Sequence, residues 1–247
     1  MRQPDFSGKY LVANGEGNDR DSVFRFDLDL GRQNPISSHD EDAFPQWSPD
    51  GLSLVFSSDS DGNDALSRIY WQEHADQQTD APPIQFDRFA LVGDHPVYLS
   101  NGRIAYKGVN SWDNWSREGI YSFEYRRNEL NKPTMITDNS NDLPTDGTGD
   151  RILFMSNRND ADWEIYITSS TTPGDTARLT YWPGCDGLAT ASPSGNTIAF
   201  MGNHEGTWAV YVMQVGGSGQ TKLFDIPNTG FGCGDGRWLN ERMSWGP

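Results

Sequence analysis

The stretch FPQWSPDGLSLVFSSDSDGNDALSRIYW, residues 44–71, decides the fold of this chain. It contains a Trp-Ser-Pro-Asp-Gly turn, an apolar run, an acidic glycine turn and a second apolar run. Short apolar runs bounded by Gly, Pro and Asp are typical of β-hairpins. The fold therefore depends on whether this arrangement occurs once or many times.

The arrangement recurs five times along the chain. The residue that closes the first turn recurs every 43 to 51 residues, at Gly8, Gly51, Gly102, Asp150 and Gly195. An aromatic in the following strand recurs with it, at Phe24, Tyr70, Tyr121, Tyr166 and Tyr211. Because two separate markers move together, the chain consists of repeat units of about 45 residues.

Each unit contains signals for four short strands. A third strand follows the aromatic, as in PPIQF, and a fourth precedes the next turn, as in PQWSP. Four strands per unit of this length are the signature of a propeller blade. We predict a single all-β domain over residues 1–247, a five-bladed β-propeller of four-stranded antiparallel blades; a β-sandwich with coincidental spacing is the alternative.

The ends of the chain predict how the ring closes. The first unit begins just before the Gly8 turn and lacks an innermost strand, whereas the C-terminal RMSWGP matches FPQWSP, with Trp245 in the place of Trp47. We therefore expect a strand at Arg242–Pro247 to complete the first blade, which would remove two free sheet edges. In the alternative, Gly234–Leu239 is the turn of a sixth, incomplete blade.

The repeat resembles that of the TolB-like β-propellers, which pair a Trp-Ser-Pro-Asp-Gly turn with an Ile-Ala-Phe strand and an Ile-Tyr-Val strand. PQWSPDGLSLVF, ILFMSNRNDADWEIYI and SPSGNTIAFMG carry the resemblance, which covers essentially the whole chain. It implies inner strands around a central channel and a periplasmic or extracellular location. It implies little about activity, because such repeats occur in binding scaffolds, peptidase domains and polysaccharide-degrading enzymes.

Charge and composition limit the partners. The formal net charge is −16, which disfavours nucleic acid and anionic membranes and favours cations or basic partners. No apolar run is long enough to span a bilayer, and MRQPDFSGKY lacks the order of a signal peptide. We expect a mature or excised domain, either a monomer or part of a larger chain, with no membrane insertion.

An acidic residue stands just before each predicted inner strand. Repetition around an axis would bring the five to one mouth of the channel, where they could hold Ca²⁺ or a basic group. As the alternative, these carboxylates cap turns and accept hydrogen bonds from backbone N–H groups at the strand entrance. The candidate metal ligands are Asp42, Asp94, Asp142, Asp186 and Glu241.

Three tryptophans are candidate ligand-binding residues. Trp112 and Trp115 lie in the polar stretch NSWDNWSREG, and Trp182 lies in TYWPGCDG. Exposed aromatics of this kind stack on sugars or anchor protein partners. Packing between blades is the alternative role.

The two cysteines, Cys185 and Cys233, each precede an inner strand and could meet across neighbouring blades. Two unpaired buried thiols are preferred over a disulfide.

We expect a non-enzymatic binding or scaffold module that recognises a protein, peptide or glycan at the acidic mouth, with Ca²⁺ as the only cofactor considered. No nucleophile motif of the type G-x-S-x-G is present. The alternative is a carbohydrate-active enzyme, a glycosidase or polysaccharide lyase, that uses channel carboxylates. Binding is preferred because the acids recur with the repeat, whereas a catalytic acid and base need different environments.

Overall fold

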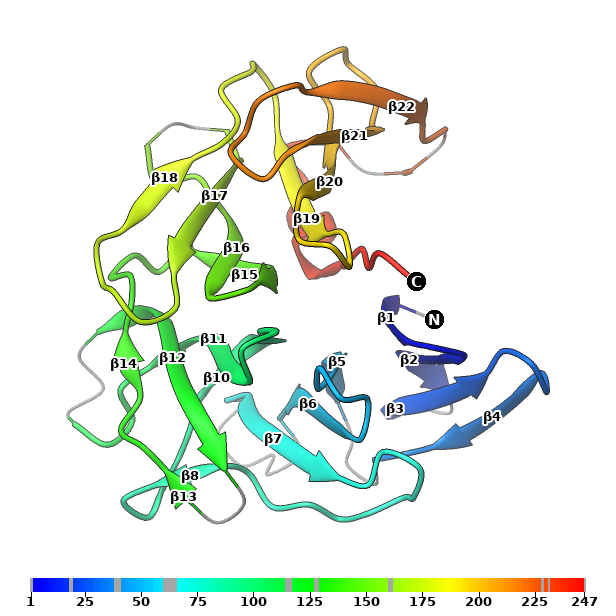
Figure 1. Ribbon diagram of the computed structural model, residues 1–247, viewed down its shortest axis with the longest axis vertical. Coiled ribbons are helices and arrows are strands. Elements are labelled where there is room, and N and C mark those ends of the chain that lie inside the picture. The colour runs from blue at the N-terminus through cyan, green and yellow to red at the C-terminus, as the bar shows by residue number, and fades with distance from the viewer. Residues whose placement is uncertain are drawn as a thin grey trace.

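The computed structural model describes residues 2–17, 20–37, 41–59, 66–113, 117–126, 129–159, 162–227, 229–230 and 232–246. Its antiparallel sheets stand around a central axis as five blades, so the predicted five-bladed β-propeller is confirmed (Figure 1). Within the described residues, no helix is long and apolar enough to cross a membrane.

Blades 1, 4 and 5 each have four strands. Blade 1 contains β1 (Arg2–Ser7), β2 (Tyr10–Gly17), β3 (Arg20–Asp27) and β4 (Arg32–Pro35). Blade 4 contains β15 (Leu143–Thr148), β16 (Arg151–Ser156), β17 (Glu164–Ser169) and β18 (Thr176–Arg178). Blade 5 contains β19 (Asp186–Ala191), β20 (Thr197–Gly202), β21 (Ala209–Gln214) and β22 (Thr221–Asp225).

Blades 2 and 3 differ at their outer edges. Blade 2 contains β5 (Asp42–Trp47), β6 (Ser53–Ser58) and β7 (Arg68–Glu73), and its fourth strand is reduced to a bridge between Tyr70 and Pro83. A small hairpin, β8 (Gln85–Phe86) and β9 (Phe89–Ala90), follows it. Blade 3 contains β10 (Gly93–Tyr98), β11 (Arg103–Val109) and β12 (Glu118–Arg126), which pairs with both β13 (Glu129–Leu130) and β14 (Thr134–Met135).

The glycine turns join the first and second strands of every blade. Gly8, Gly51, Gly102 and Gly195 hold φ between 57° and 82°, a region that L side chains disfavour. In blade 4 the residue with this conformation is Gly149, at φ 59°, and not its neighbour Asp150. The predicted turn is thus correct and its marker is displaced by one residue.

The repeated aromatic packs against a second ring from the neighbouring strand of its own blade. The pairs Phe56–Tyr70, Phe154–Tyr166 and Phe200–Tyr211 stack with ring centroids 5.3 to 5.5 Å apart. Apolar residues of adjacent blades then fill the space between the sheets; one such cluster joins Leu153 and Ile165 of blade 4 to Ile198 and Phe200 of blade 5. This buried packing explains why the aromatic position recurs.

The prediction for ring closure was wrong in one respect. The inner strand of blade 1 is β1, which pairs with β2, so the first blade is complete without the C-terminus. Residues 241–246, which we call the tail, form no strand, and Pro247 lies outside the described residues. Because β1 already satisfies the backbone of β2 on that side, the tail has no free edge there to pair with.

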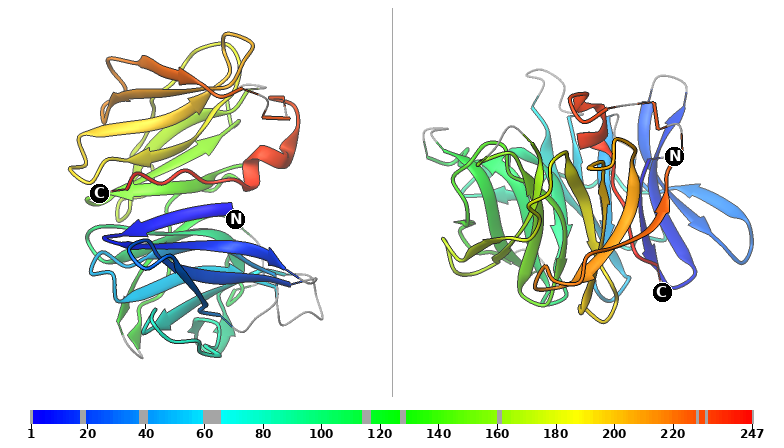
Figure 2. Two further views of the ribbon diagram at one scale, coloured as in Figure 1. Left: turned by 90° about the vertical axis from the view of Figure 1, so that its right-hand side faces the viewer. Right: turned by 90° about the horizontal axis from the view of Figure 1, so that it is seen from above.

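The tail instead lies between the first and the last blade. Consecutive inner strands pack against one another from β1 through β5, β10 and β15 to β19. Figure 2 shows the red C-terminal segment running between blade 1 and blades 4 and 5, along the side of β1. The segment proposed as the turn of a sixth blade forms the 3₁₀-helix η1 (Gly236–Asn240), which leads into the tail.

Candidate functional site

The inner strands are joined by hydrogen bonds from one blade to the next. In most blades, a side chain near the end of the inner strand accepts a hydrogen bond from a backbone N–H of the following blade. Asp5 of blade 1 accepts from the N–H of Trp47 at 2.7 Å, and Gln46 of blade 2 accepts from Tyr98 at 2.5 Å. Asp146 of blade 4 accepts from Ala191 at 2.8 Å.

One blade interrupts this pattern. Blade 3 has Val97 in the equivalent place, and a valine side chain accepts no hydrogen bond. The backbone N–H of Gly147 in blade 4 instead donates to its own neighbour Asp146, at 2.7 Å. The carboxylate of Asp146 therefore serves both its own blade and the next one.

The tail continues the pattern where a sixth blade would stand. The N–H of Trp245 donates to the hydroxyl of Thr190 in blade 5 at 3.2 Å, as Trp47 donates to Asp5. The hydroxyl of Ser244 then donates to Asp5 at 2.8 Å. The expected equivalence of Trp245 and Trp47 thus holds for their hydrogen bonds, although the tail is not a strand.

Arg242 of the tail occupies the channel itself. Its side chain is buried, with 7% exposed, and its guanidinium donates to the backbone oxygens of Phe44 and Pro96 at 3.4 and 3.0 Å. It also lies over the ring of Phe44, at 5.4 Å from the centroid. One side chain thereby connects the tail to blades 2 and 3 across the axis.

The buried groups around Arg242 have altered acidity. Burial raises the pKa of Asp5 to about 7, against the opposing effect of the Trp47 hydrogen bond. Burial also raises the pKa of Asp146, although Thr190 and Ala191 donate to its carboxylate. The pKa of Arg242 is lowered to about 10 by burial, and both aspartates oppose that change.

Asp5 and Asp146 line a pocket that opens at the mouth near the inner-strand turns. The pocket has a volume of about 340 Å³ and includes the exposed indole of Trp245. We call it the mouth pocket. Its wall consists largely of small and hydroxyl-bearing residues, among them Ser7, Gly8, Ser100, Gly147, Thr148 and Ser192.

The five acids predicted as metal ligands lie toward the other mouth and do not share one coordination sphere. Asp42 accepts a hydrogen bond from Ser37, Asp94 contacts His95 Nδ1 at 2.8 Å, and Asp142 is paired with Arg158. Asp186 is buried 3.8 Å from His204 Nδ1, and burial raises its pKa to about 8. Glu241 follows η1, and its backbone N–H caps that helix. Ca²⁺ binding by these residues stays a prediction.

The tryptophans predicted to bind ligand contact other aromatic side chains. Trp112 packs edge-on against Phe86 and Tyr121, with centroids 5.6 Å away in both cases. Trp182 packs against His204 and Tyr211. Trp115 lies outside the described residues, so its role stays a prediction.

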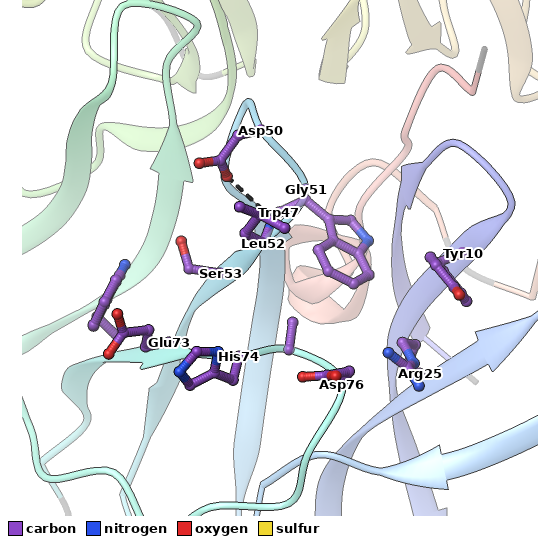
Figure 3. A pocket seen from close by; sticks show the side chains of 12 residues that line it. Tyr10, Arg25, Trp47, Asp50, Gly51, Leu52, Ser53, Glu73, His74 and Asp76 are labelled. Carbon is purple, nitrogen blue, oxygen red and sulfur yellow. Dashed lines mark hydrogen bonds between the residues drawn. The ribbon is translucent and has the colours of Figure 1, made fainter.

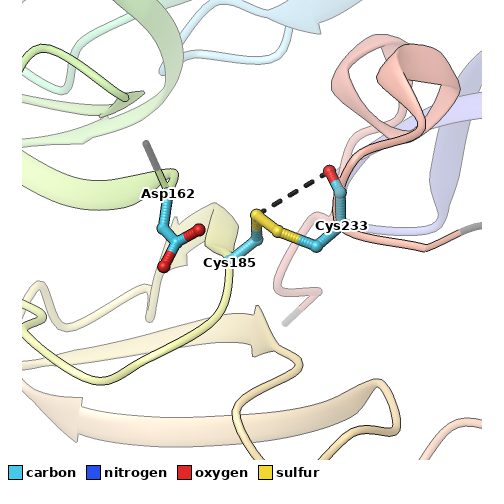
Figure 4. A group of neighbouring side chains, drawn as sticks. All are labelled: Asp162, Cys185 and Cys233. Carbon is cyan, nitrogen blue, oxygen red and sulfur yellow. Dashed lines mark hydrogen bonds between the residues drawn. A yellow bond between two sulfur atoms is a disulfide. The ribbon is translucent and has the colours of Figure 1, made fainter. Parts of the chain in front are cut away.

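The two cysteines form a disulfide, with Cα atoms 5.5 Å apart, so the preference for unpaired thiols was wrong (Figure 4). Cys185 precedes β19, and Cys233 precedes η1. The bond fixes the start of the C-terminal segment to blade 5, and a carboxylate oxygen of Asp162 lies within 4.8 Å of both sulfurs. Trp238 of η1 is fully buried beside Trp163 and Trp208, which provides a second attachment.

Sequence reasoning missed Asp5, Asp146 and Arg242, whose charges influence one another beside the inner strands. Part of a signal was present, because Gln46, Val97 and Thr190 all stand five residues before the turn glycine of their unit, but Asp5 and Asp146 stand three residues before theirs. The residue type changes from unit to unit, however, so the position shows no regular pattern of charge or polarity.

Comparisons with known proteins identify the fold. The putative TolB from Agrobacterium tumefaciens is similar with a TM-score of 0.69 and 19% identity, over 91% of this chain and 80% of that one. TolB from Acinetobacter baumannii gives 0.68 and 15%, over 91% and 54%. Oligogalacturonate lyase from Vibrio parahaemolyticus gives 0.59 and 10%, over 92% and 65%.

The chain therefore has the TolB-like β-propeller fold, as the sequence resemblance implied. It spans about half the length of the Acinetobacter protein. No protein-family model matches the sequence, and no curated protein matches it. At these identities the likeness concerns the fold alone.

Proposed function

We propose that this protein is a non-enzymatic binding module that takes a basic protein or peptide at the mouth pocket. The observation that carries the proposal is the engagement of the channel carboxylates. Asp5 accepts hydrogen bonds from Trp47 and Ser244, and Asp146 accepts from Gln46, Gly147, Thr190 and Ala191. Carboxylates that hold blades together are poorly placed to move protons to and from a substrate.

The surroundings of the pocket support recognition of a basic partner. Arg242 is held by the backbone oxygens of Phe44 and Pro96 and does not line the pocket, so its cation does not face a ligand there. Trp245 presents 37% of its surface there, and exposed tryptophans commonly anchor partners. The net charge of −16 steers positively charged molecules toward the protein. Two of the solved structures with this fold are TolB proteins, and the fold is compatible with a binding module.

Peptides selected from a random display library against the intact protein would test the proposal. We expect enrichment of Lys- and Arg-containing peptides, and a loss of affinity of at least about tenfold in Trp245→Ala. Tyr181→Ala is the matched control, because Tyr181 is 69% exposed and does not line the mouth pocket. Equal losses in both variants would contradict the proposal. So would glycan cleavage that is abolished in Asp5→Asn.

A further inference from the structure

A second pocket, with a volume of about 480 Å³, lies between blades 1 and 2. Trp47 lines both this pocket and the mouth pocket. Figure 3 shows that three segments surround it: the β5–β6 turn with Asp50 and Leu52, the end of β7 and the following loop with His74 and Asp76, and the Tyr10–Arg25 pair of blade 1. We call it the blade 1–2 pocket. No side chain of the described residues fills the blade 1–2 pocket.

The inner wall of the pocket carries hydrogen-bond donors without acceptors. Trp47 is 6% exposed, and its Nε1 donates to no described residue. The Nε of Arg25 is likewise buried without an acceptor among the described residues. Both nitrogen atoms are themselves buried, so the side chains of Trp47 and Arg25 have to shift before an acceptor atom of a ligand can reach them. Burying a donor without a partner costs about 1–3 kcal/mol, and such a contact would remove that penalty.

Aromatic surface accompanies these donors. Tyr10 and Trp47 lie with ring centroids 6.4 Å apart, and Trp71 also lines the pocket. Arg25 covers the Tyr10 ring at 4.8 Å from its centroid, which fixes the guanidinium at the edge of the pocket. The inner wall therefore offers apolar ring surface together with N–H groups.

The rim carries acceptors. Asp50 and Asp76 are both exposed. Asp50 receives the hydroxyl of Ser48 and the N–H of Leu52 through one oxygen, Oδ1. Asp76 makes no hydrogen bond or ion pair with any described residue. Groups that accept hydrogen bonds thus surround the opening, while donors lie deeper.

This distribution distinguishes between classes of ligand. A lysine or arginine side chain would place donors against donors on the inner wall and a cation beside Arg25. A polyanion would have to pass the carboxylates at the rim. A neutral sugar offers ring oxygens and hydroxyls as acceptors inside, apolar C–H faces for the aromatic rings, and hydroxyl donors for the rim.

We propose that the blade 1–2 pocket binds a neutral oligosaccharide, with Trp47 and Arg25 donating to its oxygens and Asp76 accepting from its hydroxyls. The volume is within the range of small-molecule sites, about 300–1,000 Å³. The site is separate from the contacts on which the proposed function depends, because Trp245 does not line it. Each proposal can therefore fail without the other.

Calorimetric titration of the intact protein with maltotriose, cellotriose and chitotriose tests the proposal, and trigalacturonate and hexalysine represent the rejected classes. At least one neutral trisaccharide should bind with a dissociation constant below about 10 mM. Arg25→Met should weaken that binding at least fivefold and Asp76→Asn about twofold to fivefold. Arg126→Met is the matched control, because Arg126 is 75% exposed on blade 3, and it should leave the affinity unchanged.

Circular dichroism of each variant would show whether the blades remain folded, and Asp76→Asn keeps the test valid if Arg25→Met does not fold, because Asp76 is exposed. The proposal is overturned if none of the three neutral sugars binds, or if only hexalysine or trigalacturonate binds. It is also overturned if the folded pocket variants bind as tightly as Arg126→Met.

Discussion

Replacing Asp5 by asparagine should stabilise the protein at alkaline pH. The pKa of Asp5 is raised from 3.8 to about 7 by burial, so the folded state binds a proton more tightly than the unfolded chain. The stability that this proton provides is fully present below pH 3.8 and is lost as the pH rises through about 7. Since one pKa unit corresponds to about 1.4 kcal/mol, ionisation of Asp5 opposes folding by up to about 4 kcal/mol at pH 8.

Asparagine preserves the hydrogen bonds of this position. Its amide oxygen can accept from the N–H of Trp47, and its amide nitrogen can donate to the hydroxyl of Ser244, which now serves as the acceptor. At pH 8 we expect the variant to be about 2–4 kcal/mol more stable than the native protein, a rise in Tm of roughly 5–10 °C. At pH 4 the gain should fall below about 1 kcal/mol.

Differential scanning calorimetry at pH 4, 6 and 8 measures this effect. Asp29→Asn is the control, because the Asp29 side chain is 69% exposed, and it should melt like the native protein at each pH. A lower Tm for Asp5→Asn than for the native protein at pH 8 would refute the reasoning. So would a gain in Tm that does not change between pH 4 and pH 8.

Three further predictions concern the attachment of the C-terminal segment. Cys185→Ser combined with Cys233→Ser opens a loop of 48 residues and should lower the free energy of unfolding by roughly 4 kcal/mol. Calorimetry should then show a Tm lower by about 10 °C, and adding reductant should not lower it further. Arg242→Met leaves Asp5 and Asp146 without their cation, so urea unfolding at pH 8 should show a free energy of unfolding lower by about 2–4 kcal/mol. The decrease should be smaller at pH 5, where Asp5 is protonated, and equal decreases at both pH values would contradict this. Gly187→Ala places a Cβ 2.6 Å from the Trp238 ring and should lower the free energy of unfolding by about 1–3 kcal/mol. Displacement of the ring should increase quenching of tryptophan fluorescence by acrylamide, and unchanged quenching would contradict the assigned packing.

The repeat was readable from the sequence because buried packing fixes residue type. Tyr70, Tyr166 and Tyr211 stack on an aromatic of the adjacent strand in the same way, and the turn glycines need positive φ. These constraints act within a blade and repeat with each blade. Fold class, blade number and the TolB-like resemblance followed from them.

Ring closure was not readable, because β1 lacks the repeat's features. RQPDFS has no Trp-Ser-Pro turn, and the tail, which has the tryptophan, forms no strand. The backbone N–H groups that Asp5 and Thr190 accept from are available in any sequence, so no residue type marks them. The cysteine pairing could not be predicted, because the path of the chain before η1 decides whether Cys233 reaches Cys185, and the sequence there has no strand periodicity.

The acids at the other mouth show why repetition alone does not define a site. Asp42, Asp142 and Asp186 recur as predicted and are buried, yet each interacts with a different kind of neighbour: Ser37, Arg158 or His204. Equivalent positions in a propeller share a backbone environment, while the side chains around them vary. These contacts are made by side chains, so neither a shared cation site nor turn capping follows from the repeat alone.

Hydrogen exchange of the C-terminal peptide tests most directly whether the tail closes the propeller. Mass spectrometry of the native protein should show the Trp245 amide, which donates to Thr190, exchanging at least about tenfold more slowly than in the unfolded chain. Exchange of residues 241–246 at the unfolded rate would mean that the tail does not lie between blades 1 and 5. The mouth pocket would then lack its Trp245 wall.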